Sequence, residues 1–169
     1  KNVAHYYCNY YEGKYLEALV LYQEFEDRHP TNEAIPYVMY QKGMCGYNQL
    51  DRIDRDTTGA YESIQAFREL LRAYPDSPYS DEAKARIKAA NEFLVNHEFH
   101  VVKFYLRTKK YSQAETRLNY IIANYPEAKI APRAQEMLDL IQAGTPPASG
   151  WGEWFSDLSL PSWRDYIDF

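Results

Sequence analysis

Small and apolar side chains return along this chain in a fixed pattern that predicts a repeated helix. The first copy consists of Tyr15, Ala18, Tyr22, Phe25 and Pro30. The same offsets return at Tyr111, Ala114, Leu118, Ile121 and Pro126, and a weaker copy has Ser63, Phe67, Leu70 and Pro75. The small residue lets two helices approach closely, the next two fill the groove beside it, and proline cannot continue the helix. Each copy is therefore predicted to be one helix packed closely against its neighbours.

The remaining periodicity predicts a chain that is helical almost throughout. We expect shorter helices near residues 2–12, 15–28, 34–50, 60–73, 111–124 and 132–143. Residues 79–125 contain neither glycine nor proline, which predicts one long helix from about Ser80 to Thr108. Its apolar stripe follows alternating steps of four and three residues through Ala83, Ile87, Ala90, Leu94, His97, Val101 and Phe104.

These helices predict an all-α fold with three parts. The offsets are those of the second helix of a tetratricopeptide unit, so residues 1–143 are expected to form a tetratricopeptide-repeat solenoid of helical hairpins. Residues 144–150 read as a linker, and residues 151–169 form a non-repeat aromatic tail. Repeat arrays of this kind are binding scaffolds and seldom enzymes.

The aromatic tail is predicted to be a docking segment, because exposed rings would form a patch that soluble proteins seldom tolerate. Its aromatic anchors are Trp151, Trp154, Phe155, Trp163 and Tyr166. Its acidic residues are Glu153, Asp157, Asp165 and Asp168. The tail could fold back on its own array or bind a partner that offers a basic rim. The acidic residues slightly favour a partner, since a cap for an isolated solenoid needs no such charge.

The composition excludes some classes of partner and of function. The formal net charge of −5 argues against nucleic acid, which requires a clustered basic surface. No stretch of 18 or more apolar residues is present to span a bilayer. The sequence contains no glycine-rich phosphate loop and no nucleophile motif, so we expect neither a catalytic residue nor a cofactor.

A charged insertion, residues 51–58, separates two predicted helices. Asp54, Arg55 and Asp56 are interpreted as a structural loop, in which Arg55 pairs with carboxylates and serves the fold rather than a partner.

Several segments resemble the BamD/ComL family of outer-membrane assembly lipoproteins. The resemblance is carried by residues 37–43 (Tyr-Val-Met-Tyr-Gln-Lys-Gly), 54–56 (Asp-Arg-Asp), 66–79 with their Tyr-Pro-Asp-Ser-Pro-Tyr turn, and Phe104-Tyr105. It covers about residues 13–140. The tyrosine-proline turn also occurs in other envelope repeat proteins, but together with the charged insertion it is fairly specific.

The resemblance implies a scaffold subunit of the outer-membrane β-barrel assembly (BAM) complex, with no catalytic step. It implies a protein at the periplasmic face of the outer membrane, held by a lipid anchor upstream of Lys1. The implied partners are the POTRA domain of the barrel-forming subunit, other assembly lipoproteins and unfolded outer-membrane proteins. Arg117 corresponds to an arginine that faces the POTRA domain, and Arg133 is a weaker companion. Either could instead be an ordinary exposed helix arginine.

The sequence also permits two other classes of function. A periplasmic repeat protein of the Tol-Pal coordinator type would be expected to lack the charged insertion. A metal-dependent enzyme could use His97 and His100, but His97 lies in the apolar stripe, so we expect core packing and no metal site. Cys8 and Cys45 share one register in successive helices, whose axes should lie about 8 to 10 Å apart, so we expect two free thiols.

Overall fold

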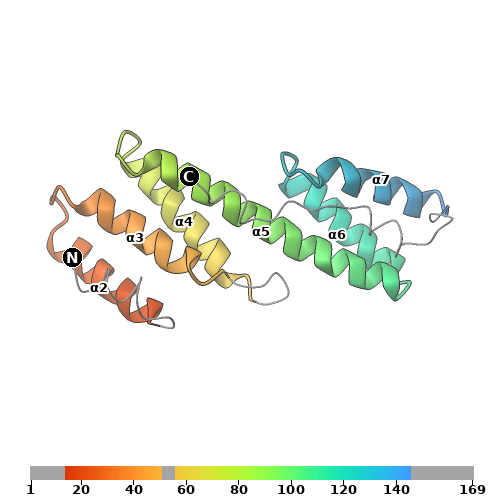
Figure 1. Ribbon diagram of the computed structural model, residues 1–169, viewed down its shortest axis with the longest axis horizontal. Coiled ribbons are helices and arrows are strands. Elements are labelled where there is room, and N and C mark those ends of the chain that lie inside the picture. Colours follow the sequence, from red (N-terminus) through yellow and green to blue (C-terminus); the bar gives the residue numbers. More distant parts are fainter. Residues whose placement is uncertain (1–13, 51–55, 146–169) are drawn as a thin grey trace. The chain divides into compact units, whose positions relative to one another are not determined.

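The computed structural model describes residues 14–50 and 56–145, and these residues form helices joined by short turns (Figure 1). The helices are α2 (Tyr15–Arg28), α3 (Ile35–Tyr47), α4 (Thr58–Ala73), α5 (Ser80–Arg107), α6 (Tyr111–Asn124) and α7 (Ala131–Gln142). Within the described ranges no residue belongs to a strand, so the predicted all-α fold is confirmed. None of these helices is both long and apolar enough to cross a membrane. The helix expected at residues 2–12 lies outside the described residues.

The helix boundaries agree with the sequence pattern except around the charged insertion. Helix α3 ends at Tyr47 rather than Leu50, and α4 begins at Thr58 rather than near Ala60. Asp56 accounts for the earlier start, because its carboxylate accepts hydrogen bonds from the backbone N–H of Thr58 at 2.9 Å and from the Thr58 hydroxyl at 2.7 Å. These hydrogen bonds from Thr58 lower the pKa of Asp56. Asp54 and Arg55, the other residues of the predicted structural loop, lie outside the described residues.

The internal repeat is confirmed by burial. The small residue and the large residue four positions after it are at most 1% exposed in all three copies: Ala18 and Tyr22 in α2, Ser63 and Phe67 in α4, and Ala114 and Leu118 in α6. Leu70 and Ile121 are equally buried, whereas Tyr15 and Phe25 are half-buried and Tyr111 is 38% exposed.

The turn after each of these three helices is also the same. The residue before the proline accepts a hydrogen bond from the backbone N–H three residues later, over 3.0 to 3.1 Å. The donor and acceptor pairs are Asn32 with His29, Ser77 with Tyr74, and Ala128 with Tyr125. The proline therefore ends each helix in the same geometry, as the sequence pattern predicts.

Close contacts divide the chain into two compact units. Unit 1 contains the described residues up to Asn91, and unit 2 contains those from Glu92 onward. Helix α5 contributes residues to both units.

In unit 1, α3 packs against α2 and α4, and two glycines on α3 bring it unusually close to α4. A Cβ atom placed on Gly46 would lie 2.9 Å from both the carbonyl oxygen of Gly59 and the backbone nitrogen of Ser63. A Cβ atom on Gly43 would clash with the ring of Phe67, which is fully buried. The α3–α4 packing therefore requires glycine at both positions.

The prediction of a free thiol at Cys45 is wrong, because Cys45 is disulfide-bonded and buried in unit 1. The prediction compared the spacing of helix axes with a limit that applies to Cα atoms. Each Cα lies about 2.3 Å from its axis, so facing Cα atoms of helices about 8 to 10 Å apart can approach to about 3.4 to 5.4 Å, which is within the reach of a disulfide. Cys8, the other cysteine of the sequence, lies outside the described residues.

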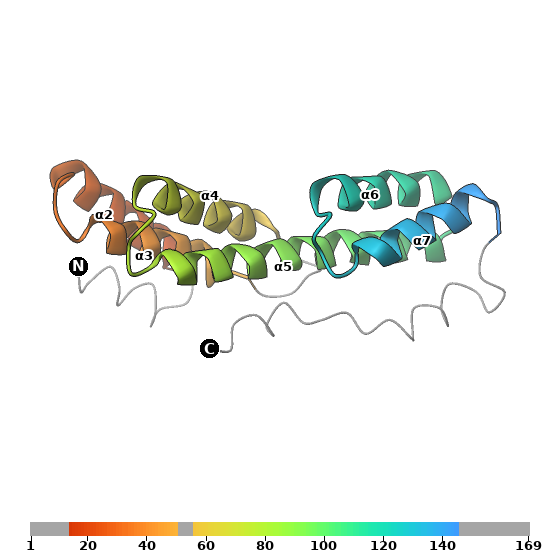
Figure 2. The same ribbon diagram turned by 90° about the horizontal axis from the view of Figure 1, so that it is seen from above.

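In unit 2, residues of α5, α6 and α7 share one core, and Figure 2 shows α6 and α7 side by side. The face that α5 buries there is not the predicted one. Its core residues are Val95, Phe99, Val102 and Leu106, whereas Val101 is half-buried and Phe104 is 48% exposed. Both series follow steps of four and three residues, so periodicity alone could not distinguish them.

A cluster of aromatic and charged side chains in unit 1 attaches the first turns of α5 to α3. The guanidinium of Arg86 lies 5.0 Å from the ring centre of Tyr47 and pairs with Glu82 at 3.0 Å. The rings of Tyr40 and Tyr79 stack at 5.2 Å, and Glu82 also shares a hydrogen bond with Tyr40. Partial burial opposes ionisation of Glu82, but the hydrogen bonds with Tyr40 and Arg86 outweigh it and lower the pKa of Glu82 below 4.5.

This cluster predicts a specific acid sensitivity. Because the pKa of Glu82 is lower in the folded chain, its contribution to stability is present above the unfolded pKa and is lost as the pH falls through the folded pKa. Glu82→Gln should cost about 0.5 to 1 kcal/mol at pH 7 and should flatten the decline of the melting temperature between pH 5 and pH 3. Thermal melts followed by circular dichroism test this. Asp81→Asn is the matched control, and an equal flattening in both variants would contradict the prediction.

Candidate partner-binding site

Arg117 lies on α6 immediately before the buried motif residue Leu118, and its side chain contacts α5. Its Nη1 atom donates to the Glu98 carboxylate at 3.0 Å to Oε2 and 3.3 Å to Oε1. The Glu98 side chain is 11% exposed, whereas that of Arg117 is 43% exposed. The arginine thus neutralises a nearly buried carboxylate while much of its guanidinium remains at the surface.

The geometry leaves Arg117 able to bind a second carboxylate. All of its hydrogen bonds to described residues pass through Nη1. A guanidinium carries five N–H donors, so the others can serve a partner.

Sequence reasoning did not identify Glu98. The sequence signal that could have revealed Glu98 is its position next to Phe99, which belongs to the apolar series of α5 that packs in unit 2.

Arg133 occupies a different environment on α7. Its Nη1 atom pairs at 2.6 Å with Glu136 of the same helix, and both side chains are considerably exposed. Pairs of this kind between residues three apart contribute little to stability. The structure therefore places the two predicted arginines on neighbouring helices, each with its own carboxylate.

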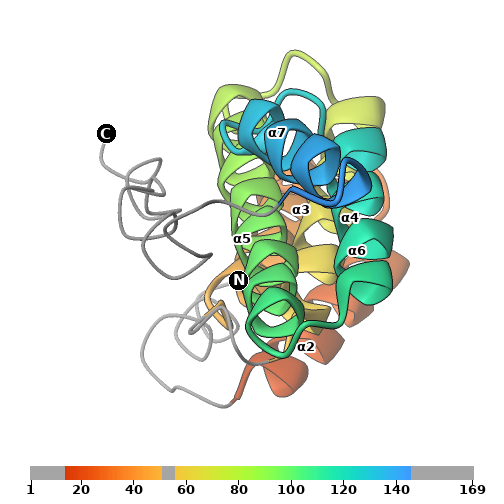
Figure 3. The same cartoon turned by 90° about the vertical axis from the view of Figure 1, so that its right-hand side faces the viewer.

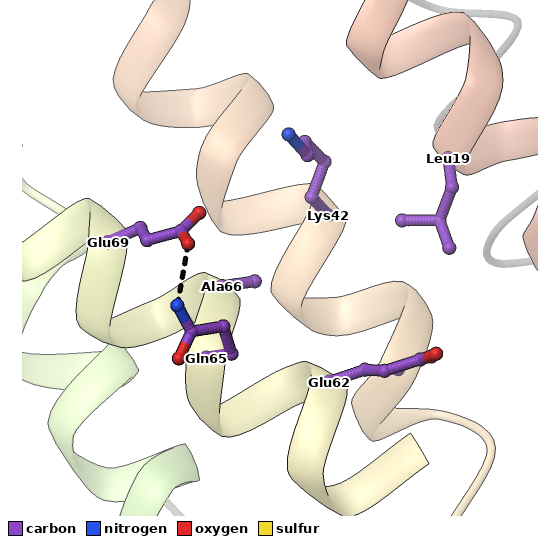
Figure 4. Close-up of a pocket in the computed structure, with 7 residues that line it drawn as sticks. Leu19, Lys42, Glu62, Gln65, Ala66 and Glu69 are labelled. Atoms are coloured by element: carbon purple, nitrogen blue, oxygen red, sulfur yellow. Dashed lines mark hydrogen bonds between the residues drawn. The ribbon is translucent and has the colours of Figure 1, made fainter. Parts of the chain in front are cut away.

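Unit 1 contains a groove of about 250 Å³ that sequence reasoning did not predict. It is lined by residues of α2, α3 and α4: Leu19, Lys42, Gly46, Glu62, Gln65, Ala66 and Glu69. Figure 4 labels all of these except Gly46. The Lys42 amine donates to Glu26 at 2.7 Å and to Gln23 at 2.8 Å, and Gln65 donates to Glu69 at 2.7 Å. The groove thus combines an apolar lining with acidic residues of α4.

The remaining residues considered as a possible site are two histidines of α5 and the aromatic anchors of the tail. His97 is half-buried on α5, and His100 is exposed. In the part of the chain that the structure describes, no group of three or more His, Cys, Asp or Glu side chains could hold a metal ion. The aromatic anchors Trp151, Trp154, Phe155, Trp163 and Tyr166 lie outside the described residues.

Repeated helical hairpins with buried repeat positions define a helical-repeat protein of the tetratricopeptide type. The chain belongs to the YfiO family of outer membrane lipoproteins, whose model matches residues 2–143.

Curated relatives are consistent with this family. An outer membrane protein assembly factor BamD of Pasteurella multocida is 27% identical over 142 residues, which are 78% of this chain and 55% of the relative. The protein of the same name from Haemophilus influenzae is 27% identical over 133 residues, covering 73% of this chain and 51% of the relative. The protein of the same name from Vibrio cholerae is 27% identical over 141 residues, covering 78% of this chain and 58% of the relative. The chain thus spans about half the length of these relatives.

Proposed function

We propose that this chain is part of a scaffold subunit of the outer-membrane β-barrel assembly complex. The observation that carries the proposal is the family match over residues 2–143, together with relatives named as outer membrane protein assembly factors. A helical-repeat array suits this role, because it presents extended surfaces to several partners at once.

Arg117 is the proposed anchor for the POTRA domain of the barrel-forming subunit. Its exposed guanidinium is held in place by Glu98, so little side-chain entropy is lost when a partner binds. A partner carboxylate would then form the charge-assisted hydrogen bonds for which Arg is suited. Arg133 is proposed as a weaker contact, because its pair with Glu136 is exposed and local.

The groove of unit 1 is a proposed contact for extended segments of unfolded outer-membrane proteins. Leu19 and Ala66 offer apolar surface, and Glu62 and Glu69 can accept hydrogen bonds from backbone N–H groups. Other assembly lipoproteins are further proposed partners on the remaining surface of the array.

The proposed location is the periplasmic face of the outer membrane, with a lipid anchor in the full-length protein. The disulfide at Cys45 supports an oxidising compartment such as the periplasm, because disulfides are rare in the reducing cytosol.

Affinity purification of the full-length protein from envelope membranes tests the proposal. We expect the barrel-forming subunit and other assembly lipoproteins to co-purify. An unrelated tagged outer-membrane lipoprotein is the control for nonspecific recovery. Recovery of Tol-Pal components without the barrel-forming subunit would contradict the proposal and favour a coordinator function.

A further inference from the structure

Unit 2 carries a concentrated positive charge where α5 turns into α6, within a chain whose net charge is −5. Residues 99–114 contain four Lys or Arg residues and no Asp or Glu. We call this surface the basic tip and define it by Lys103, Arg107, Lys109 and Lys110. Figure 3 shows the short turn from α5 to α6 that carries it.

The turn holds its charges in an ordered arrangement. The N–H of Lys110 donates to the carbonyl of Tyr105 at 2.8 Å, and that of Lys109 donates to the carbonyl of Leu106 at 3.1 Å. This is the Schellman pattern, and it places Lys109 at φ 57° in the left-handed region. Because Lys109 and Lys110 are fixed by the turn and exposed, their charges remain at the surface.

The tip also offers cations and rings to a ligand. Arg107, Lys109 and Lys110 form no ion pair with any residue that the structure describes, and all three are exposed. Phe104 is 48% exposed and Tyr111 is 38% exposed. A surface that combines cations with half-exposed rings suits a ligand that is both acidic and aromatic.

The chain itself supplies such a ligand at the same end of unit 2. Helices α6 and α7 form an antiparallel hairpin (Figure 2), so the end of α7 lies beside the start of α6, where the basic tip is. Gly144, at φ 66°, ends α7 with the N–H of Thr145 donating to the carbonyl of Leu140 at 3.1 Å. Only residues 146–150 then separate the described chain from Trp151.

We propose that the aromatic tail, residues 151–169, docks on the basic tip of its own chain. The tail carries four acidic residues and a single Arg, together with the three tryptophans of the sequence. Its acidic residues pair with the Lys and Arg side chains of the tip, and its indole rings stack on the Arg107 guanidinium and on the exposed rings.

The linker makes this docking favourable even if each contact is weak. Six residue steps from Thr145 to Trp151 span at most about 20 Å, whereas the axes of packed helices are about 8 to 10 Å apart. A short tether of this kind gives an effective concentration in the millimolar range. The acidic residues of the tail need a basic surface to pair with. The basic tip provides one within the same chain, so no partner is needed.

Tryptophan fluorescence of the full chain tests the proposal, because all three tryptophans lie in the tail. We expect blue-shifted emission that is protected from acrylamide and independent of protein concentration. The tip variant Arg107→Glu/Lys109→Glu/Lys110→Glu should lower the ratio of protected to accessible indole about tenfold, since three exposed ion pairs are lost. Circular dichroism should be unchanged. One molar salt should reduce the protection of the wild-type chain.

The matched control reverses three exposed cations of unit 1, Arg68→Glu/Arg72→Glu/Lys84→Glu, and should leave the emission unchanged. Adding Glu153→Arg, Asp157→Arg and Asp165→Arg to the tip variant should restore protection. The proposal is overturned if the wild-type indoles are fully accessible, or if the tip variant keeps its protection. Protection that requires a second copy of the chain or anionic phospholipid vesicles would also overturn it.

Discussion

Gly46→Ala should lower the free energy of unfolding by about 2 to 3 kcal/mol, because overpacking at this position cannot be relieved by a side chain. The added methyl group would lie 2.9 Å from two backbone atoms of α4, the Gly59 carbonyl oxygen and the Ser63 nitrogen. Relief requires α3 and α4 to separate, which loosens the packing of Ser63 and Phe67 in the same interface. Chemical denaturation followed by circular dichroism measures the loss.

Gly144→Ala is the matched control for this prediction. A Cβ atom on Gly144 would meet nothing within 4 Å, but its φ of 66° is strained for alanine. That strain alone should cost about 1 kcal/mol. A loss at Gly46 no larger than the loss at Gly144 would show that the α3–α4 contact tolerates a methyl group, and the prediction would be wrong.

Arg117→Leu should weaken binding to the POTRA domain by about 2 kcal/mol, or roughly 30-fold, if the proposed anchor is desolvated in the complex. The same change leaves the nearly buried carboxylate of Glu98 without its cation. Arg117→Leu should therefore also reduce the free energy of unfolding, because an unpaired buried group costs about 1 to 2 kcal/mol of stability. The single variant Arg117→Leu would therefore combine a loss of partner binding with a loss of stability.

A double variant separates them. Glu98→Gln with Arg117→Leu removes the charge and its cation together, and its binding should be compared by calorimetry with that of Glu98→Gln alone. The difference isolates the contact of Arg117 with the partner. Arg133→Leu, which alters an exposed pair, should change binding by less than about 1 kcal/mol. Equal affinities for the double variant and Glu98→Gln would remove Arg117 from the interface.

The features that the sequence alone determined about this protein are local. The bounds of α2 and α6 follow from their apolar positions and from the proline after each helix, and both were predicted to the residue. The repeat could be recognised because its small residue and the large residue four positions later are buried in all three helices. Such features depend on residues a few positions apart, where periodicity and backbone restrictions act directly.

Other features were decided by tertiary structure, because they depend on which surfaces meet. The two apolar series on α5 have the same spacing, and only packing in unit 2 selects Val95, Phe99, Val102 and Leu106. Nineteen positions separate Glu98 from Arg117, and no local rule joins them. The disulfide at Cys45 depends on the distance between Cα atoms of packed helices, which is much shorter than the distance between their axes. Contacts of this kind form only when the helices pack, so a linear pattern does not contain them.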